Sequence, residues 1–269
     1  MAVGDDVGLF GPGSAVWEVH GSISTLVGGI RALLMQAAHP AALTGVAEHS
    51  QYDTDPLGRL ERTTRWLTIT SFGSTEAIAR EAQRVNEIHK RVSGDFHDKS
   101  GHQDKYSAAD PRYLLWVHCA FTDSFLRTYE ELGYHSADLG DQYIREWAKS
   151  AQPLGLSKAP LSRQEMRDEI ARFASQEVGA IAMTSPIVKF ILKPPFSKGG
   201  LFFYAILRNA AISTIDQPFL KILGLKPRSN NWLRVSRVLL DFLSYMLGHV
   251  SPSQKIARAR IERIQLSHE

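Results

Sequence analysis

Two histidines lie where amphipathic helices would bury them. His89 shares an apolar stripe with Ile78, Ala82, Val85 and Val92, at the spacing of the core-facing side of a helix. A buried neutral imidazole needs a polar partner, because an unpaired polar group in the interior costs free energy. The stripe therefore predicts an interior polar site at His89.

His118 repeats this pattern on another predicted helix, in a stripe with Leu114, Phe121, Phe125 and Leu132. Two such histidines in a helical bundle suit a metal or a haem, since haem iron is held by a rigid imidazole in an apolar pocket. The residues leave open a simpler interpretation. Each imidazole could be packed in the core and hydrogen-bonded to a carbonyl or to the other ring.

Zinc or non-haem iron would need further ligands besides these two imidazoles. The candidates in the sequence are His39, His49, Asp53 and Asp55. The chain has neither a His-x-x-x-His nor a His-Glu-x-x-His pair, so the zinc-protease class is excluded.

Arg59 and Thr63 are four residues apart and share one face of a predicted helix, with Arg62 beside them. A guanidinium and a hydroxyl at the rim of a buried site could hold an anion, a haem propionate or bound oxygen. The alternative is that these arginines are solvated and paired with surface carboxylates such as Glu61. Spacing alone does not decide between the two.

The composition is that of an ordinary soluble protein, with 269 residues, of which 43% are hydrophobic and 22% charged. A net charge of +3 is too weak to indicate nucleic-acid binding. The single cysteine, Cys119, excludes an intrachain disulfide and favours a cytoplasmic location. We expect no secretory signal at the N-terminus and no spanning helix, because no apolar run of sufficient length lacks charge.

Helical periodicity dominates the chain, which predicts an all-α fold with a flexible lead-in at residues 1–15 and one helical domain at 16–269. Ser74 and Asp110-Pro111 are expected to begin helices, and Gly94 and Gly133 to end them. Residues 95–109 are expected to be a mobile loop, and no strand is predicted. Further helices are expected at about 24–38, 57–72, 137–151, 161–184, 199–214, 216–223, 229–249 and 251–265.

Residues 187–207 combine aromatic and apolar side chains with Lys189, Lys193 and Lys198 and a Pro194-Pro195 break. One interpretation is peripheral membrane contact or a portal for an apolar ligand. The other is a core-facing loop between helices, whose lysines are solvated.

A longer pattern joins these residues. It consists of His39-Pro40, His49, Asp55-Pro56-x-x-Arg59-Leu60-x-Arg62-Thr63, Arg84-Val85-x-x-Ile88-His89 and Trp116-Val117-His118. Its order and spacing over about residues 20–130 resemble the rubber-oxygenase catalytic domain family. That family groups latex-clearing proteins, a fungal oxygenase of mycophenolic acid synthesis and many bacterial proteins.

The resemblance implies a single helical domain with globin-like packing around a pocket that holds one haem b. In this family the proximal iron ligand corresponds to His89, and a later histidine near the haem corresponds to His118. The residues themselves leave open that these two roles are exchanged. Arg59, Arg62 and Thr63 align with a distal Arg-x-x-Lys-Thr motif. Arg62 replaces its lysine and, unlike lysine, does not readily lose its proton.

The implied activity is that of a haem-dependent oxygenase, an oxidoreductase that uses dioxygen as co-substrate. The chain is shorter than the secreted rubber-cleaving enzymes, so we expect a small apolar substrate, such as an alkene, an isoprenoid or a lipid-like molecule, inside the cell. The alternative is a non-catalytic helical carrier or sensor that binds haem or an apolar ligand. A third is an interaction protein whose histidines are merely packed.

Overall fold

The computed structural model describes residues 6–49, 56–134 and 139–266, and only the backbone of residues 56–61. Helices form most of the described chain, so the all-α prediction is confirmed. The α-helices are α1 (Ala15–Gly21), α2 (Thr25–Gln36), α3 (Pro40–His49), α4 (Pro56–Phe72), α5 (Thr75–His89), α6 (Pro111–Glu131), α7 (Leu139–Trp147), α8 (Arg163–Gln176), α9 (Thr184–Leu192), α10 (Lys198–Ser213), α11 (Gln217–Ile222), α12 (Asn231–Leu247) and α13 (Pro252–Leu266).

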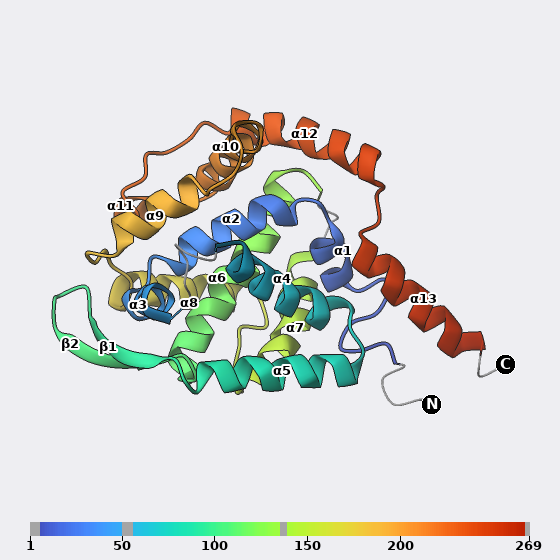
Figure 1. Cartoon of the computed structure of the whole chain (residues 1–269), viewed down its shortest axis with the longest axis horizontal. Helices are drawn as coiled ribbons and strands as arrows, with labels where there is room; N and C mark the ends of the chain where they lie inside the picture. Colours follow the sequence, from blue (N-terminus) through green and yellow to red (C-terminus); the bar gives the residue numbers. More distant parts are fainter. Residues whose placement is uncertain (1–5, 50–55, 135–138, 267–269) are drawn as a thin grey trace.

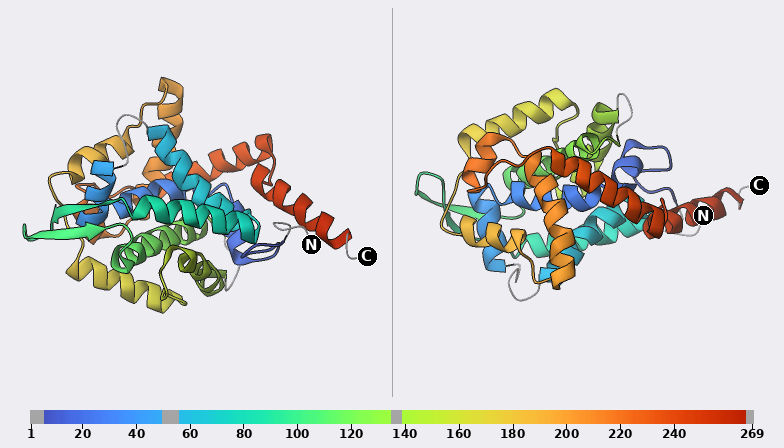
Figure 2. Two further views of the ribbon diagram at one scale, coloured as in Figure 1. Left: turned by 60° about the horizontal axis from the view of Figure 1, so that its bottom comes forward. Right: turned by 90° about the horizontal axis from the view of Figure 1, so that it is seen from above.

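Helices α2 and α6 pack side by side at the centre of the molecule. Around them, α10 and α12 lie at the top of Figure 1 and α5 runs along the bottom, while α13 extends toward the C-terminal end. The views of Figure 2 show that α12 and α13 lie on the outside of the bundle. Globin-like packing stays an expectation from the family resemblance.

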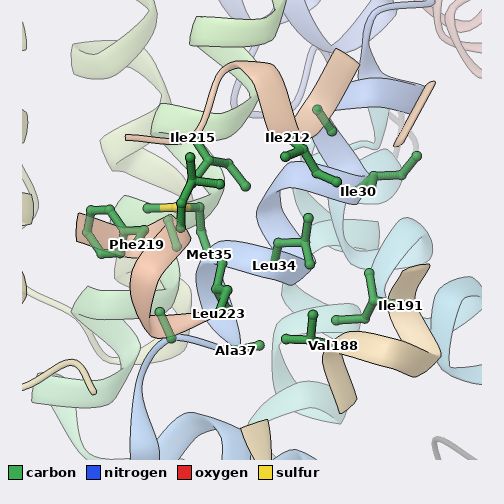
Figure 3. Close-up of a cluster of buried hydrophobic side chains, with 14 of the residues drawn as sticks. Ile30, Leu34, Met35, Ala37, Val188, Ile191, Ile212, Ile215, Phe219 and Leu223 are labelled. Carbon is green, nitrogen blue, oxygen red and sulfur yellow. The ribbon is translucent and has the colours of Figure 1, made fainter. Parts of the chain in front are cut away.

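The largest hydrophobic cluster joins α2 to the helices of the C-terminal third. Figure 3 shows Leu34 and Met35 of α2 facing Ile212 of α10, Phe219 of α11 and Val188 of α9. This cluster therefore packs α2 against helices that are distant from it in sequence. Within the second cluster, Phe10 is 3% exposed and its carbonyl accepts a hydrogen bond from Trp17 Nε1, so residue 10 is anchored in the core.

The expected helix boundaries at polar and glycine residues are confirmed at several positions. The Ser74 hydroxyl accepts a hydrogen bond from the Ala77 N–H, and Asp110 accepts one from the Arg112 N–H ahead of α6. Gly133 follows α6 with a φ of 78°, a left-handed conformation that glycine adopts without steric cost.

The predictions for residues 93–109 were wrong. Strands β1 (Ser93–His97) and β2 (Gln103–Ser107) form an antiparallel hairpin, and α5 ends at His89 rather than at Gly94. Each strand buries only one large side chain, Phe96 or Tyr106, so the alternation is too short to stand out from a charged loop.

Residues 187–207 also differ from a loop between helices, because 187–192 belong to α9 and 198–207 to α10, and only 193–197 connect the two helices. Ile187, Val188 and Ile191 are buried on the inner side, whereas Phe202 is 73% exposed. The helix predicted at 161–184 ends at Gln176, and the one predicted at 137–151 divides into α7 and the 3₁₀ helix η1 (Ala148–Leu154).

An ion pair that the sequence did not indicate fastens α2 to α6. Arg31 is 1% exposed, and its Nη1 lies 2.7 Å from Asp123 Oδ2 and 2.8 Å from Ser124 Oγ. Its Nε donates to the Thr214 carbonyl after α10, at 3.4 Å. A buried guanidinium with three such partners ties three helices together at the centre of the fold.

Candidate functional site

A cavity of about 550 Å³ lies among α3, α4, α5, α6, η1 and the β-hairpin. Its volume is within the range of pockets that bind small molecules and cofactors. The lining is mainly apolar and includes a few polar residues. Both histidines singled out from the sequence, His89 and His118, line this one cavity.

His89 is the last residue of α5 and is partly buried. Its Nδ1 atom is buried without a hydrogen-bond partner among the described residues. Burial lowers the pKa of the ring, so the imidazole is neutral near pH 7. A neutral ring with an unsatisfied nitrogen beside an apolar cavity is suited to bind a ligand there.

His118 lies in the middle of α6 and is 8% exposed. Burial lowers the pKa of His118 to about 4, so this ring is neutral as well. Its Nε2 atom is buried and has no hydrogen-bond partner in the described part of the chain. The predicted stripe is thus confirmed for His118, and both rings fit a group that would satisfy their nitrogens.

The predicted distal residues come from α4. Arg62 and Thr63 line the same cavity as the two histidines; Arg62 is exposed and Thr63 is partly buried. Arg59 lies one turn earlier in α4, and its side chain is outside the described residues. The structure therefore brings two of the three predicted distal residues to the cavity.

Comparison with known proteins places these residues in a family. The model for "ER-bound oxygenase mpaB/B'/Rubber oxygenase, catalytic domain" matches residues 17–245. The chain belongs to this oxygenase family. A search of curated proteins and a search of solved structures each found no match. The matched range includes every residue that lines the cavity, whereas α13 of this oxygenase-family chain lies beyond it.

A buried carboxylate beside the cavity was missed by the sequence analysis. Glu81 is 3% exposed and accepts hydrogen bonds from Arg84 Nε at 3.1 Å and from Arg65 Nε at 3.0 Å. Burial would raise the pKa of Glu81, but the two arginines outweigh it and lower the pKa. Arg84 also lines the cavity. The available signal was that Glu81 follows Ile78 by three residues and shares its buried face.

The histidines proposed as additional metal ligands lie in different places. His49 lines the cavity, with its Nε2 3.1 Å from the hydroxyl of Tyr106, which donates to Glu48 at 2.8 Å. His39 is in the core and does not line the cavity. Among the described residues no three His, Cys, Asp or Glu side chains form a metal-binding group. Asp53 and Asp55 lie outside the described residues.

His39 instead belongs to an ion cluster around Glu177. The Glu177 carboxylate lies 3.3 Å from His39 Nε2, 2.7 Å from Arg112 Nε and 2.6 Å from Arg172 Nη1. Burial alone would raise the pKa of Glu177, but the hydrogen bonds from these three partners have the larger effect and lower the pKa to about 2. The cluster joins α6 and α8 to the start of α3.

We predict that Glu177 makes stability depend on pH in the acid range. Because its pKa is lowered in the folded state from 4.5 to about 2, its contribution is complete above pH 4.5 and is lost as the pH falls toward 2. Replacing Glu177 by Gln should cost about 3 kcal/mol at pH 7 and flatten the acid slope. Urea unfolding at a series of pH values measures the free energy of unfolding and its dependence on pH. If the pH dependence below 4.5 is the same in the variant, Glu177 is not the group responsible.

Proposed function

We propose that the chain is a haem b-dependent oxygenase that acts on a small apolar substrate with dioxygen. The observation that carries this proposal is the apolar cavity that His89 and His118 both line, each with a buried ring nitrogen that lacks a partner among the described residues. The family membership supports an oxygenase activity. Haem dependence and the substrate class are the parts that we infer.

His89 is the residue that would hold the haem iron, with His118 as the neighbouring imidazole in the same cavity. A bound haem would supply the one-electron and dioxygen chemistry that no protein side chain provides. Both rings are neutral at physiological pH because burial lowers their pKa values, so each offers a nitrogen lone pair without first losing a proton.

Arg62 and Thr63 would act on the oxygen side of the reaction. The cationic guanidinium of Arg62 can stabilise negative charge that develops on oxygen. The Thr63 hydroxyl can orient the same group by donating a hydrogen bond. We assign Arg59 the same role from the family pattern, since its side chain lies outside the described residues.

The substrate class follows from a second cavity beside the first. It has a volume of about 500 Å³, and Thr63, Leu67 and Phe121 line both cavities. Its walls are predominantly apolar, so a hydrocarbon chain would bury its surface there and keep water from the reacting group. An alkene, isoprenoid or lipid-like molecule fits these walls better than a sugar or nucleotide.

Replacing Thr63 by Val tests the proposed oxygen-side role, because it removes the hydroxyl and keeps the shape. We expect the haem-loaded variant to keep its absorption spectrum and to lose about 100-fold in oxygen consumption with an alkene panel that includes farnesol. Thr44→Val, in α3 and outside both linings, is the control. Bound haem without oxygen consumption in any unmodified sample would favour the carrier or sensor instead.

We retain peripheral membrane contact through residues 187–207 as a proposal, together with a cytoplasmic location. The membrane contact is supported by the exposed side chains of this segment. They are Lys189 of α9, Lys193 between the helices, and Lys198 and Phe202 of α10. Exposed apolar side chains are also frequent on α12 (Val235, Val238, Phe242, Tyr245, Met246 and Leu247). In the described part of the chain no helix has the length and apolarity required to cross a membrane.

A further inference from the structure

The second cavity has an unusually neutral lining. Its walls come from α2, α4, α6, α9 and α10, from His20 of α1 and from the segment between α9 and α10, and none of the described lining residues is Asp, Glu, Lys or Arg. Ile30 and Ile191, two core residues labelled in Figure 3, contribute to these walls. A charged ligand would lose its hydration there without gaining a counter-ion, so the cavity selects against carboxylates and phosphates.

Hydroxyl groups are concentrated on one helix of this cavity. Thr63, Thr64, Thr68 and Ser71 of α4 all contribute to the lining. Thr63 lies where the two cavities meet, whereas Ser71 is two turns further along α4. Eight residues of α-helix correspond to about 12 Å, which sets the distance along α4 between the two ends of a bound molecule.

Ser71, which is itself buried, belongs to a hydrogen-bonded chain that runs through the partly buried His20 to the buried Tyr143. Its Oγ lies 2.7 Å from His20 Nδ1, and His20 Nε2 lies 2.8 Å from the hydroxyl of Tyr143. Burial lowers the pKa of His20 to about 3, which keeps the ring neutral. The rings of Phe125 and Trp147, 5.1 and 4.3 Å away between centroids, fix the imidazole in place.

A neutral imidazole leaves Ser71 with hydrogen-bonding capacity for a ligand. If Tyr143 donates to His20 Nε2, then His20 Nδ1–H donates to Ser71 Oγ, and the Ser71 proton is available to an acceptor in the cavity. In the opposite tautomer, Ser71 donates to Nδ1 and its oxygen can accept a hydrogen bond. Either arrangement recognises a neutral oxygen group, a hydroxyl or a carbonyl, and neither neutralises an anion.

We propose that the second cavity binds an elongated, neutral, apolar molecule with one hydroxyl or carbonyl group, and that Ser71, positioned by His20, receives that group. When its oxygen group binds at Ser71, the apolar part of the molecule extends along α4 toward Thr63 and the first cavity, which His89 and His118 line. This inference rests on the proposed function insofar as the bound molecule is called a substrate. It narrows the proposed substrate class to neutral hydrocarbons that carry one oxygen group. The binding itself requires no haem.

The test compares four probes that share one isoprenoid chain: farnesol, farnesene, farnesoic acid and farnesyl diphosphate. Their affinities are measured by isothermal titration calorimetry with the full-length protein as purified, at pH 8. We expect farnesol to bind about tenfold more tightly than farnesene, because it adds one hydrogen bond in a buried site. The acid and the diphosphate should bind more weakly than the alcohol.

Two variants locate the binding. Ser71→Ala should reduce farnesol to the affinity of farnesene, while the control Ser150→Ala, which lines only the first cavity, keeps the preference. Gly29→Leu should abolish binding of both probes, since Gly29 lines the second cavity and a Cβ there meets no atom within 4 Å. The added side chain can therefore fill the cavity without displacing the backbone.

Equal affinities for all four probes, or tightest binding of an anionic probe, would overturn the inference. Farnesol binding that is unchanged in Gly29→Leu would overturn it too, by placing the ligand elsewhere. Absorption spectra of the same samples, recorded before and after addition of hemin, separate this result from the proposed function. Selective farnesol binding by a protein that contains no haem and takes up no hemin supports the inference and contradicts the oxygenase proposal; bound haem without alcohol preference does the reverse.

Discussion

Replacing His89 by Ala is expected to abolish the Soret band of the haem-loaded protein and to weaken hemin binding by about 100-fold or more. Loss of groups that only support a metal ligand already costs about 10–100-fold in affinity, so loss of the ligand should cost at least as much. His89 is partly buried at the end of α5, and an alanine there leaves the apolar contacts of Ile78 and Ala82 in place. Hemin titration followed by absorbance measures the effect.

His118→Ala is the informative companion variant, because both imidazoles line one cavity. We expect it to keep a Soret band at a shifted wavelength. If His118→Ala instead removes the band and His89→Ala keeps it, the two roles are exchanged. His97→Ala, on the exposed face of β1, controls for the loss of a histidine as such. Equal unfolding temperatures of the variants would exclude misfolding as the cause.

Replacing Arg31 by Met is expected to destabilise the fold by about 3 kcal/mol. The variant keeps much of the side chain's length but leaves Asp123 without its 2.7 Å partner. It also removes the hydrogen bonds to Ser124 and to the Thr214 carbonyl. Removing one member of a buried ion pair costs about 3–5 kcal/mol, and Asp123, whose side chain is 24% exposed, puts this case at the lower end.

Arg127→Met is the matched control. Arg127 lies in α6 and forms an ion pair with Asp216, which precedes α11, in a more exposed position. Exposed ion pairs contribute about 0–1 kcal/mol, so this variant should unfold at nearly the urea concentration of the unmodified protein. If Arg31→Met lost no more stability than Arg127→Met, Arg31 would not be the central fastening of α2 to α6.

The parts of the fold that were predictable depend on local patterns. The Ser74 and Asp110 caps are decided by neighbours within three residues, and the structure has both. The burial of His118 was predictable for the same reason, since the 3.6-residue period of the apolar face of α6 is visible in the sequence itself. His89 and His118 could be named from their spacing, and in the structure both line one cavity.

The parts that were not predictable depend on contacts between distant segments. Arg31 and Asp123 are separated by 92 positions, and nothing near either residue shows that they meet. The same holds for His20, which bonds Ser71 of α4 and Tyr143 of α7. The hairpin of β1 and β2 was missed because one buried aromatic per strand does not make a recognisable alternation.

The absorption spectrum and iron content of the purified, unmodified protein test the central claim most directly. The account predicts a Soret band, either as isolated or after addition of hemin, with one iron per chain. A protein that stays colourless, contains no iron and cannot be reconstituted with hemin would contradict it.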